Sequence, residues 1–106
     1  MDIQAKMKNG VCKVRIVGEM TIYDAGEMKP QLLKQLARAT ELEIDLSGVS
    51  EFDSAGLQLL ILLKREAARH GKILRLLTHS LSVLGVFTLT RADAFFGDIV
   101  VLPSGA

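Results

Sequence analysis

The chain has 106 residues, of which 49% are hydrophobic and 24% charged, and its 13 basic and 12 acidic residues give a formal net charge of +1. This length predicts a single domain over residues 1–106, and the balanced charge argues against a nucleic-acid-binding protein, which carries a clear basic excess. The longest strongly apolar run, residues 57–63, is far shorter than the roughly 20 residues that span a bilayer.

The N-terminal part predicts a β-hairpin. Residues 3–8 and 11–17 both alternate apolar with polar side chains, and Asn9-Gly10 lies between them. Asn-Gly between two alternating runs is the strongest short-range hairpin signal. We expect Gly18 to end the second strand. The side chains of that strand that face the core are then Cys12, Val14 and Ile16.

A helix is predicted next, within residues 23–39, where apolar residues recur at helical spacing. Asp24 or Thr21 can cap its start. Pro30 removes an internal hydrogen bond from any helix that begins more than a turn earlier, so we expect a loose first turn and a regular helix from about residue 28. The periodic apolar positions are Met28, Leu32, Leu33, Leu36 and Ala37.

The second half of the chain alternates strands and helices. Residues 42–48 predict a short buried strand, and a helix follows from about Ala55 to Arg69, with Gly71 as its stop. Three further elements are expected, namely a strand over 72–77, a short helix over 80–90 with Leu81, Leu84 and Val86 or Phe87 inward, and a last strand over 98–102. This order predicts an α/β fold, with a mixed, mostly parallel sheet that begins with a hairpin and packs against alternating helices.

Residues that carry catalytic or metal chemistry are scarce. The sequence has no Gly-rich phosphate loop and no Cys/His cluster at metal spacing. His70 and His79 are expected at the surface or in loops, and the lone Cys12 is interpreted as a small core side chain in a reducing cytoplasm. Ser54 lacks the first glycine of the Gly-x-Ser-x-Gly nucleophile motif. We therefore predict no enzyme activity, no catalytic residue, no metal site and no cofactor.

The stretch Asp53-Ser54-Ala55-Gly56 starts the second helix. An aspartate is well suited to accept hydrogen bonds from the unpaired amides of the first turn, which would leave the Ser54 hydroxyl pointing outward in small, open surroundings. A phosphate on it would carry about −1.5 to −2 charges. The helix N-terminus would stabilise that anion, while an acidic or apolar partner surface would be repelled. The alternative is that Ser54 only caps the helix.

The helix after Ser54 is apolar on more than one side. If Leu57 is at the centre of its inward face, Leu60, Ile61 and Ala68 lie beside it. A second group, made of Leu59, Leu62 and Leu63, then falls largely on the other side. Two interpretations are equally open for this second group, a partner surface or packing against a neighbouring helix of the same domain.

Two segments, GEMTIYDAGEMKPQLL and LEIDLSGVSEFDSAGLQLLILLKREAARHGKILRLL, resemble STAS domains, the family named for sulfate transporters and anti-sigma-factor antagonists. The resemblance covers about residues 3–102. Its most specific part is a strand ending in Asp-Leu-Ser, a short loop, Asp-Ser-x-Gly-Leu and a helix. The chain is most similar to the stand-alone bacterial members of the anti-sigma-factor-antagonist type.

The resemblance implies a cytoplasmic, partner-switching regulator of transcription or another signalling process. In stand-alone members the serine at the position of Ser54 is phosphorylated. The dephosphorylated form binds an anti-sigma factor, or a similar serine kinase of the histidine-kinase-like ATPase fold. Phosphorylation separates the complex, and a metal-dependent PP2C-type phosphatase restores the binding form. We expect a monomer. The resemblance implies that Ser54 is the phosphorylation site. The residues expected to contact the partner lie around it: Thr21, Tyr23, Asp24, Asp53, Ala55, Gly56, Gln58, Leu59, Leu62 and Leu63.

The sequence departs from the family pattern in two places. Many sigma-factor antagonists have an acidic residue at Thr21, and the Thr-Ile-Tyr variant looks like proteobacterial members that accompany chemotaxis, biofilm or two-component systems. Ala55 replaces the second hydroxyl residue of Asp-Ser-Ser-Gly or Asp-Ser-Thr-Gly, which leaves Ser54 as the lone acceptor.

Two other functions are compatible with a STAS domain. One is a constitutive subunit of a lipid-transport ABC complex, which binds the ATPase permanently and often has threonine after the aspartate. The other is a binder of a nucleotide or lipid, although nothing in the sequence resembles a nucleotide cradle. A stable association with an ATPase that Ser54→Asp does not weaken would indicate the ABC subunit.

Overall fold

Asn9 and Gly10 form the turn of the predicted hairpin. In the computed structural model, which describes residues 2–91, their φ angles are 53° and 82°. Positive φ at both central residues is what a two-residue type I′ turn requires. The turn joins strand β1 (Asp2–Lys8) to strand β2 (Val11–Met20), which pair antiparallel. The hairpin prediction is confirmed.

Strand β2 continues past Gly18, so the prediction that this glycine ends the strand is wrong. Gly18 has a φ of 104°, and the register with the neighbouring strand shifts between Gly18 and Glu19. Such a shift is a β-bulge, which bends a strand without ending its pairing. Beyond it, Glu19 and Met20 pair with residues 51 and 52 of the next strand.

Helix α1 spans Ala25–Arg38 and begins three residues earlier than predicted. The Thr21 carbonyl oxygen accepts hydrogen bonds from the amides of Asp24 (3.0 Å) and Ala25 (2.8 Å), which forms a turn that leads into the helix. Asp24 occupies the N-cap position, but its side chain makes no capping hydrogen bond. Pro30 lies within the helix, whose anchoring side chains Met28, Leu32 and Leu36 are all buried. Their packing outweighs the one hydrogen bond that proline removes.

The remaining described elements follow the predicted order. They are strand β3 (Glu41–Phe52), helix α2 (Ser54–Arg69), strand β4 (Ile73–His79) and helix α3 (Leu81–Thr90). Helix α2 ends before Gly71, which has a φ of 66°, as expected of a glycine stop. Strand β3 is longer than predicted, because its second half pairs with β2 beyond the bulge. The predicted strand over 98–102 lies outside the described residues.

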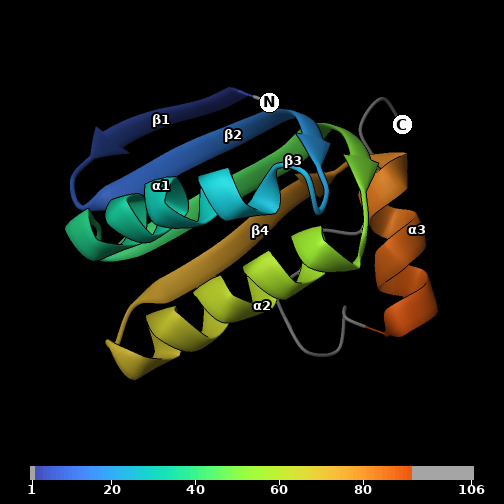
Figure 1. The fold of residues 1–106 in the computed structure, drawn as a ribbon. Coiled ribbons are helices and arrows are strands. Elements are labelled where there is room, and N and C mark those ends of the chain that lie inside the picture. Colours follow the sequence, from blue (N-terminus) through green and yellow to red (C-terminus); the bar gives the residue numbers. More distant parts are fainter. Residues whose placement is uncertain (1, 92–106) are drawn as a thin grey trace.

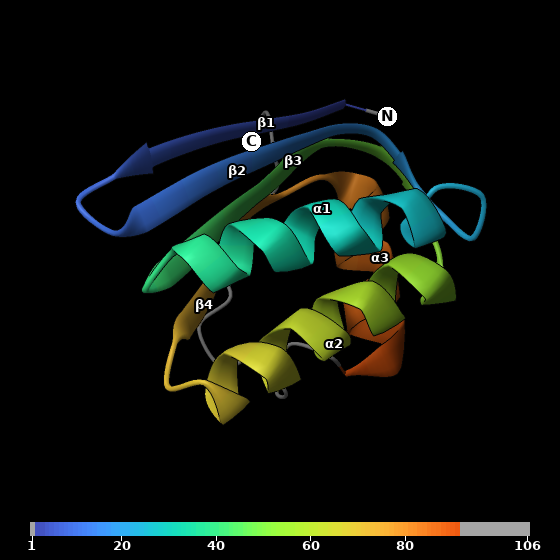
Figure 2. The same ribbon diagram turned by 60° about the vertical axis from the view of Figure 1, so that its left-hand side comes forward.

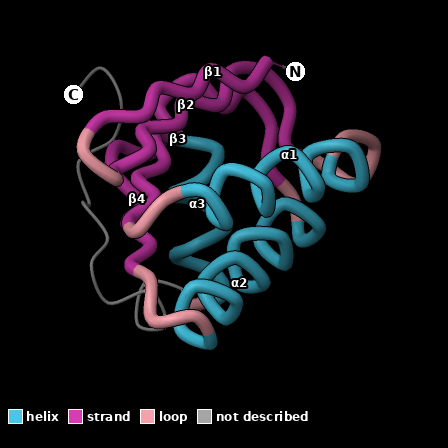
Figure 3. The backbone as a smooth tube through the Cα atoms, turned by 90° about the vertical axis from the view of Figure 1, so that its left-hand side faces the viewer, coloured by secondary structure: helices cyan, strands magenta, loops and turns pink. Residues whose placement is uncertain are grey.

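The sheet has the order β1-β2-β3-β4, and its last three strands are parallel to one another. Helices α1 and α2 lie side by side on one face, and α3 stands where β3 and β4 end (Figures 1 and 2). Figure 3 shows the sheet edge-on, with the helices on one side of it. The predicted α/β architecture is confirmed. Because three parallel strands each lead into a helix, the starts of α1, α2 and α3 meet at one edge of the sheet.

The core lies between the sheet and the helices. Strand side chains that face it include Cys12, Val14, Ile16, Leu42, Ile44, Leu46, Leu74 and Leu76, all at most 2% exposed. The inward side chains of α3 are Val83 and Phe87, whereas Leu81, predicted to face inward, is 73% exposed. Ala68 of α2 is also exposed rather than inward.

Candidate functional site

Asp53 caps helix α2 and connects two loops. One carboxylate oxygen, Oδ1, accepts hydrogen bonds from the amides of Ala55 (2.9 Å) and Gly56 (3.2 Å). The other, Oδ2, accepts from the amide of Ile22 (3.0 Å), in the loop between β2 and α1. Desolvation favours the protonated acid, but the three N–H donors outweigh it and hold the pKa of Asp53 below its ordinary value. The carboxylate therefore ties the starts of α1 and α2 together.

Ser54 is the first residue of α2, and its side chain is exposed. Within residues 2–91 its hydroxyl has no hydrogen-bond partner, because Asp53 performs the capping. The prediction that Asp53 caps and Ser54 faces outward is confirmed, and the alternative that Ser54 is the cap is wrong. The hydroxyl is free for a partner or a modifying enzyme to reach.

A hollow of about 590 Å³ lies on one side of Ser54. We call it the acidic hollow, because three carboxylates line it, from the end of β2, the end of β3 and the start of α2. Its lining residues are Glu19, Thr21, Tyr23, Glu51, Phe52, Asp53 and Ser82. Thr21 is only 8% exposed, and its Oγ1 atom has no hydrogen-bond partner in the described part of the chain. Tyr23, in contrast, is 88% exposed at the rim.

A second, smaller hollow of about 320 Å³ lies on the other side of Ser54, between the first turns of α1 and α2. We call it the Lys29 groove, after the charged residue in its wall. Small residues of both helices make it shallow. Its lining residues are Ala25, Gly26, Lys29, Ala55, Gln58, Leu59 and Leu62. The residue before Ser54, Asp53, thus lines a negatively charged hollow, and the residue after it, Ala55, lines a groove that is positively charged and partly apolar.

Several residues predicted to contact a partner are instead buried. Leu59 is 4% exposed and Leu63 is completely buried, because α1 packs alongside α2 and covers that side (Figure 2). Gly56 is buried under the end of β2, and Thr21 is nearly so. Of the two interpretations left open for these leucines, packing against a neighbouring helix holds for Leu59 and Leu63, so their place among the partner contacts is wrong, and Leu62 is half-buried. Of the other predicted residues, Tyr23 and Gln58 are exposed, and Asp24, Asp53 and Ala55 are half-buried.

Sequence reasoning missed four lining residues of the acidic hollow, Glu19, Glu51, Phe52 and Ser82, and three of the Lys29 groove, Ala25, Gly26 and Lys29. Glu19 and Glu51 come two positions before Thr21 and Asp53, so two neighbouring strands end with matching acidic residues. That pattern was a usable signal. Ser82 was not foreseeable in this way, since only the packing of α3 against β3 brings it there, where its hydroxyl donates to the Ser50 carbonyl oxygen (2.8 Å).

The two histidines and the cysteine lie away from Ser54's surface. His70 is exposed, as predicted, but His79 is completely buried at the end of β4, which corrects the prediction. Cys12 is buried in the core, and desolvation raises the pKa of its thiol. Residues 2–91 contain no group of three or more His, Cys, Asp or Glu side chains placed to hold a metal ion.

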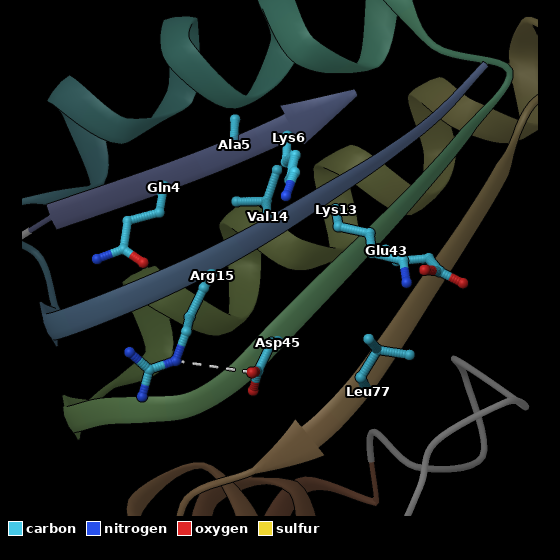
Figure 4. Close-up of a pocket in the computed structure, with 9 residues that line it drawn as sticks. All are labelled: Gln4, Ala5, Lys6, Lys13, Val14, Arg15, Glu43, Asp45 and Leu77. Carbon is cyan, nitrogen blue, oxygen red and sulfur yellow. Dashed lines mark ion pairs between the residues drawn. The ribbon is translucent and has the colours of Figure 1, made fainter. Parts of the chain in front are cut away.

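A third hollow, of about 440 Å³, lies on the face of the sheet that the helices leave open (Figure 4). Lysine and arginine side chains from β1 and β2 face carboxylates from β3 across it. Arg15 and Asp45 form an ion pair of 3.7 Å in this hollow. Its mixed charges largely neutralise one another, and none of its lining residues lines either hollow beside Ser54.

None of the helices in the described range 2–91 combines the length and the apolar character that a membrane span requires.

Comparison with known proteins agrees with this geometry. A family model described as "Mlab, STAS domain" matches residues 3–102. Among solved structures, the anti-sigma factor antagonist SpoIIAA in its unphosphorylated form superimposes with a TM-score of 0.75 and 19% identity, covering 93% of this chain and 86% of that one. An anti-sigma factor antagonist from Mycobacterium paratuberculosis superimposes with a TM-score of 0.80 and 22% identity, and the match covers 90% of this chain and 81% of that one. SpoIIAA of Bacillus in its phosphorylated form superimposes with a TM-score of 0.73 and 18% identity, and the match covers 93% of this chain and 89% of that one. At these identities the likeness is one of fold.

Proposed function

Because the chain belongs to the STAS domain family, we propose that it is a non-catalytic, partner-switching regulator controlled by phosphorylation of Ser54. Its unphosphorylated form binds a protein partner, an anti-sigma factor or similar serine kinase of the histidine-kinase-like ATPase fold. The kinase transfers the γ-phosphoryl group of ATP to Ser54 Oγ, which loses its proton, and ADP leaves. A PP2C-type phosphatase then uses water to restore the serine and release inorganic phosphate.

One observation carries this proposal. Ser54 is exposed at the start of α2, yet Asp53 already makes the capping hydrogen bonds. A hydroxyl that the fold does not need can gain and lose a phosphoryl group without unfolding the helix. The likeness in fold to anti-sigma factor antagonists supports the same assignment. Because the proposed kinase uses ATP, we expect the regulator to work in the cytoplasm, as a single-domain monomer.

The surroundings of Ser54 give a physical reason for release. A partner that covers Ser54 also covers its neighbours Asp53 and Ala55, which line the acidic hollow and the Lys29 groove. A phosphoryl group of about −1.5 to −2 charges would have to be desolvated there, close to Asp53, which is costly without a dedicated counter-charge on the partner. The fold need not change for the affinity to fall.

The test compares Ser54→Ala with Ser54→Asp in affinity capture of the partner, after peptide mapping of the native protein across residues 41–64 for a phosphoryl group. We expect Ser54→Ala to retain the partner, and Ser54→Asp to recover at least ten times less of it. The control Gln31→Glu, which adds a negative charge on an exposed position of α1, should bind like the unaltered protein. Equal recovery of one ATPase by both Ser54 variants would instead support a constitutive subunit of a lipid-transport ABC complex.

A further inference from the structure

The backbone amides at the start of α2 are already engaged. Asp53 Oδ1 accepts from the amides of Ala55 and Gly56, and the Asp53 carbonyl oxygen accepts from the amide of Leu57 (3.1 Å). An anion at a helix N-terminus ordinarily binds to such free amides. A phosphoryl group on Ser54 would find these three amides occupied, so, apart from the amide of Ser54 itself, its hydrogen bonds have to come from side chains.

The charges on the two sides of Ser54 are opposite. On one side, the acidic hollow presents the carboxylates of Glu19, Glu51 and Asp53. On the other, the Lys29 groove contains Lys29 and Gln58, whose side chains can donate hydrogen bonds, and Ala55 adjoins Ser54 in its wall. Electrostatics therefore directs a phosphoryl group away from the hollow and into the groove.

Lys29 is available for such a contact. It is exposed on the first turns of α1, and no ion pair within residues 2–91 involves it. Its flexible four-carbon stem lets the ammonium group adjust to an anion nearby. Gly26, beside it in the groove, has open space around it, since an added Cβ would meet no heavy atom within 4 Å. Nothing in the described groove blocks a phosphoryl group.

We propose that Lys29 is the counter-ion of phosphorylated Ser54, and that the phosphoryl group lies in the Lys29 groove between the starts of α1 and α2. This inference rests on the proposed function, and it adds where the phosphoryl group goes and which residue holds it. A phosphoryl group in that place fills the groove and neutralises Lys29. A partner then loses both a recess for its side chains and a positive charge, in addition to the cost of desolvation.

The experiment uses the full chain with phosphoserine incorporated at position 54 during translation, so that no kinase is needed. Phosphorus NMR follows the second ionisation of the phosphoserine from pH 4 to 8. With Lys29 present, we expect the second pKa of the phosphoserine to be about 0.2 to 0.7 of a pH unit lower than in Lys29→Gln, the range of an exposed ion pair. Lys29→Arg should keep the lower value, and about 1 M salt should reduce the difference.

Lys34→Gln is the matched control, because Lys34 is also exposed on α1 but does not line the groove. It should titrate like the unaltered protein. Identical titration curves for the unaltered protein and Lys29→Gln would overturn the proposal, as would an equal shift for Lys34→Gln.

The failure of this inference and of the proposed function can be told apart. If the phosphoserine protein shows the Lys29-dependent shift but still binds the partner as Ser54→Ala does, the counter-ion assignment stands and partner switching is wrong. If phosphoserine abolishes binding of the partner but its second pKa is the same in the unaltered protein and in Lys29→Gln, partner switching stands and the counter-ion assignment is wrong.

Discussion

At the scale of single residues, Gly56 shows how a surface motif can have an internal cause. We predicted that it contacts the partner beside Ser54. It is buried instead, and a Cβ at this position would collide with the Met20 carbonyl oxygen and approach the Phe52 ring to 2.9 Å. The glycine therefore allows the first turn of α2 to pack directly against the ends of β2 and β3.

This leads to a prediction for Gly56→Ala, which should lower the free energy of unfolding by about 1–3 kcal/mol, because backbone cannot move aside as a flexible side chain can. Urea unfolding followed by circular dichroism measures it. The matched variant is Gly26→Ala, in open space in the first turn of α1, which should be neutral or gain about 0.4–1 kcal/mol. Equal stability of Gly56→Ala and the unaltered protein would contradict the packing role.

Residue types alone predicted part of this site. Asp53 as the cap follows from its carboxylate and its position before an apolar run, both of which are local. The contact between Gly56 and Met20 joins residues 36 positions apart, and no local pattern reports it. Leu59 and Leu63 were misjudged for the same reason, since the helix that covers them lies earlier in the chain.

At the scale of elements, the junction of β4 and α3 contains a buried histidine. His79 is completely buried, its ring lies 5.3 Å from that of Phe87, and neither ring nitrogen has a hydrogen-bond partner within residues 2–91. Desolvation lowers the pKa of His79 below its ordinary value, although nearby Asp45 favours the charged form. The packing of α3 on the sheet thus requires an uncharged ring.

From this junction we predict a stability that depends on pH. The unfolded chain protonates His79 below about pH 6.5, while the folded protein resists until a lower pH. Stability is therefore full above pH 6.5 and falls as the pH drops from there toward the folded pKa. Thermal melts between pH 5 and 7.5 measure it. His79→Phe should remove most of this dependence, and the exposed-residue control His70→Gln should keep it; a pH dependence unchanged in His79→Phe would refute the assignment.

The elements themselves were largely predictable, and their ends were not. The hairpin followed from Asn9-Gly10, and α2 from its cap and its glycine stop. The extensions of β2 and β3 come from their pairing with each other across a bulge, which neither segment shows alone. In α3, apolar residues occur on all sides, so periodicity could not distinguish the inward Val83 and Phe87 from the exposed Leu81.

At the scale of the whole molecule, the fold separates two faces of the sheet. Helices cover one face, and the starts of all three helices meet at the edge where Ser54 lies (Figures 1 and 3). The other face presents charged side chains, with Arg75 paired to Glu41 at 2.7 Å and Arg15 paired to Asp45. The alternation of strands and helices predicted a mostly parallel sheet packed against helices. That the helices lie on one face, and which loops lie beside Ser54, depended on the order of the strands.

The position of β1 has a consequence for behaviour at high concentration. Among the described strands β1 pairs only with β2, so residues 2–91 leave one row of its backbone N–H and C=O groups unpaired, the kind of edge to which a strand of another molecule can add. Lys6 and Lys8 stand on this strand, and Lys6 is directly opposite Lys13, a like-charge pair that weakens the hairpin slightly. Charge on such a strand opposes the approach of a second copy, so these lysines protect solubility at a small cost in stability.

The double variant Lys6→Gln/Lys8→Gln should therefore self-associate at concentrations at which the unaltered protein does not, as measured by sedimentation velocity over a dilution series. Lys34→Gln/Arg38→Gln removes the same two positive charges from exposed positions of α1 and should sediment like the unaltered protein. Equal self-association of both double variants would trace the effect to net charge rather than to the strand. Self-association of the β1 variant alone would mean that the lysines of the N-terminal hairpin also oppose ordered aggregation of the protein.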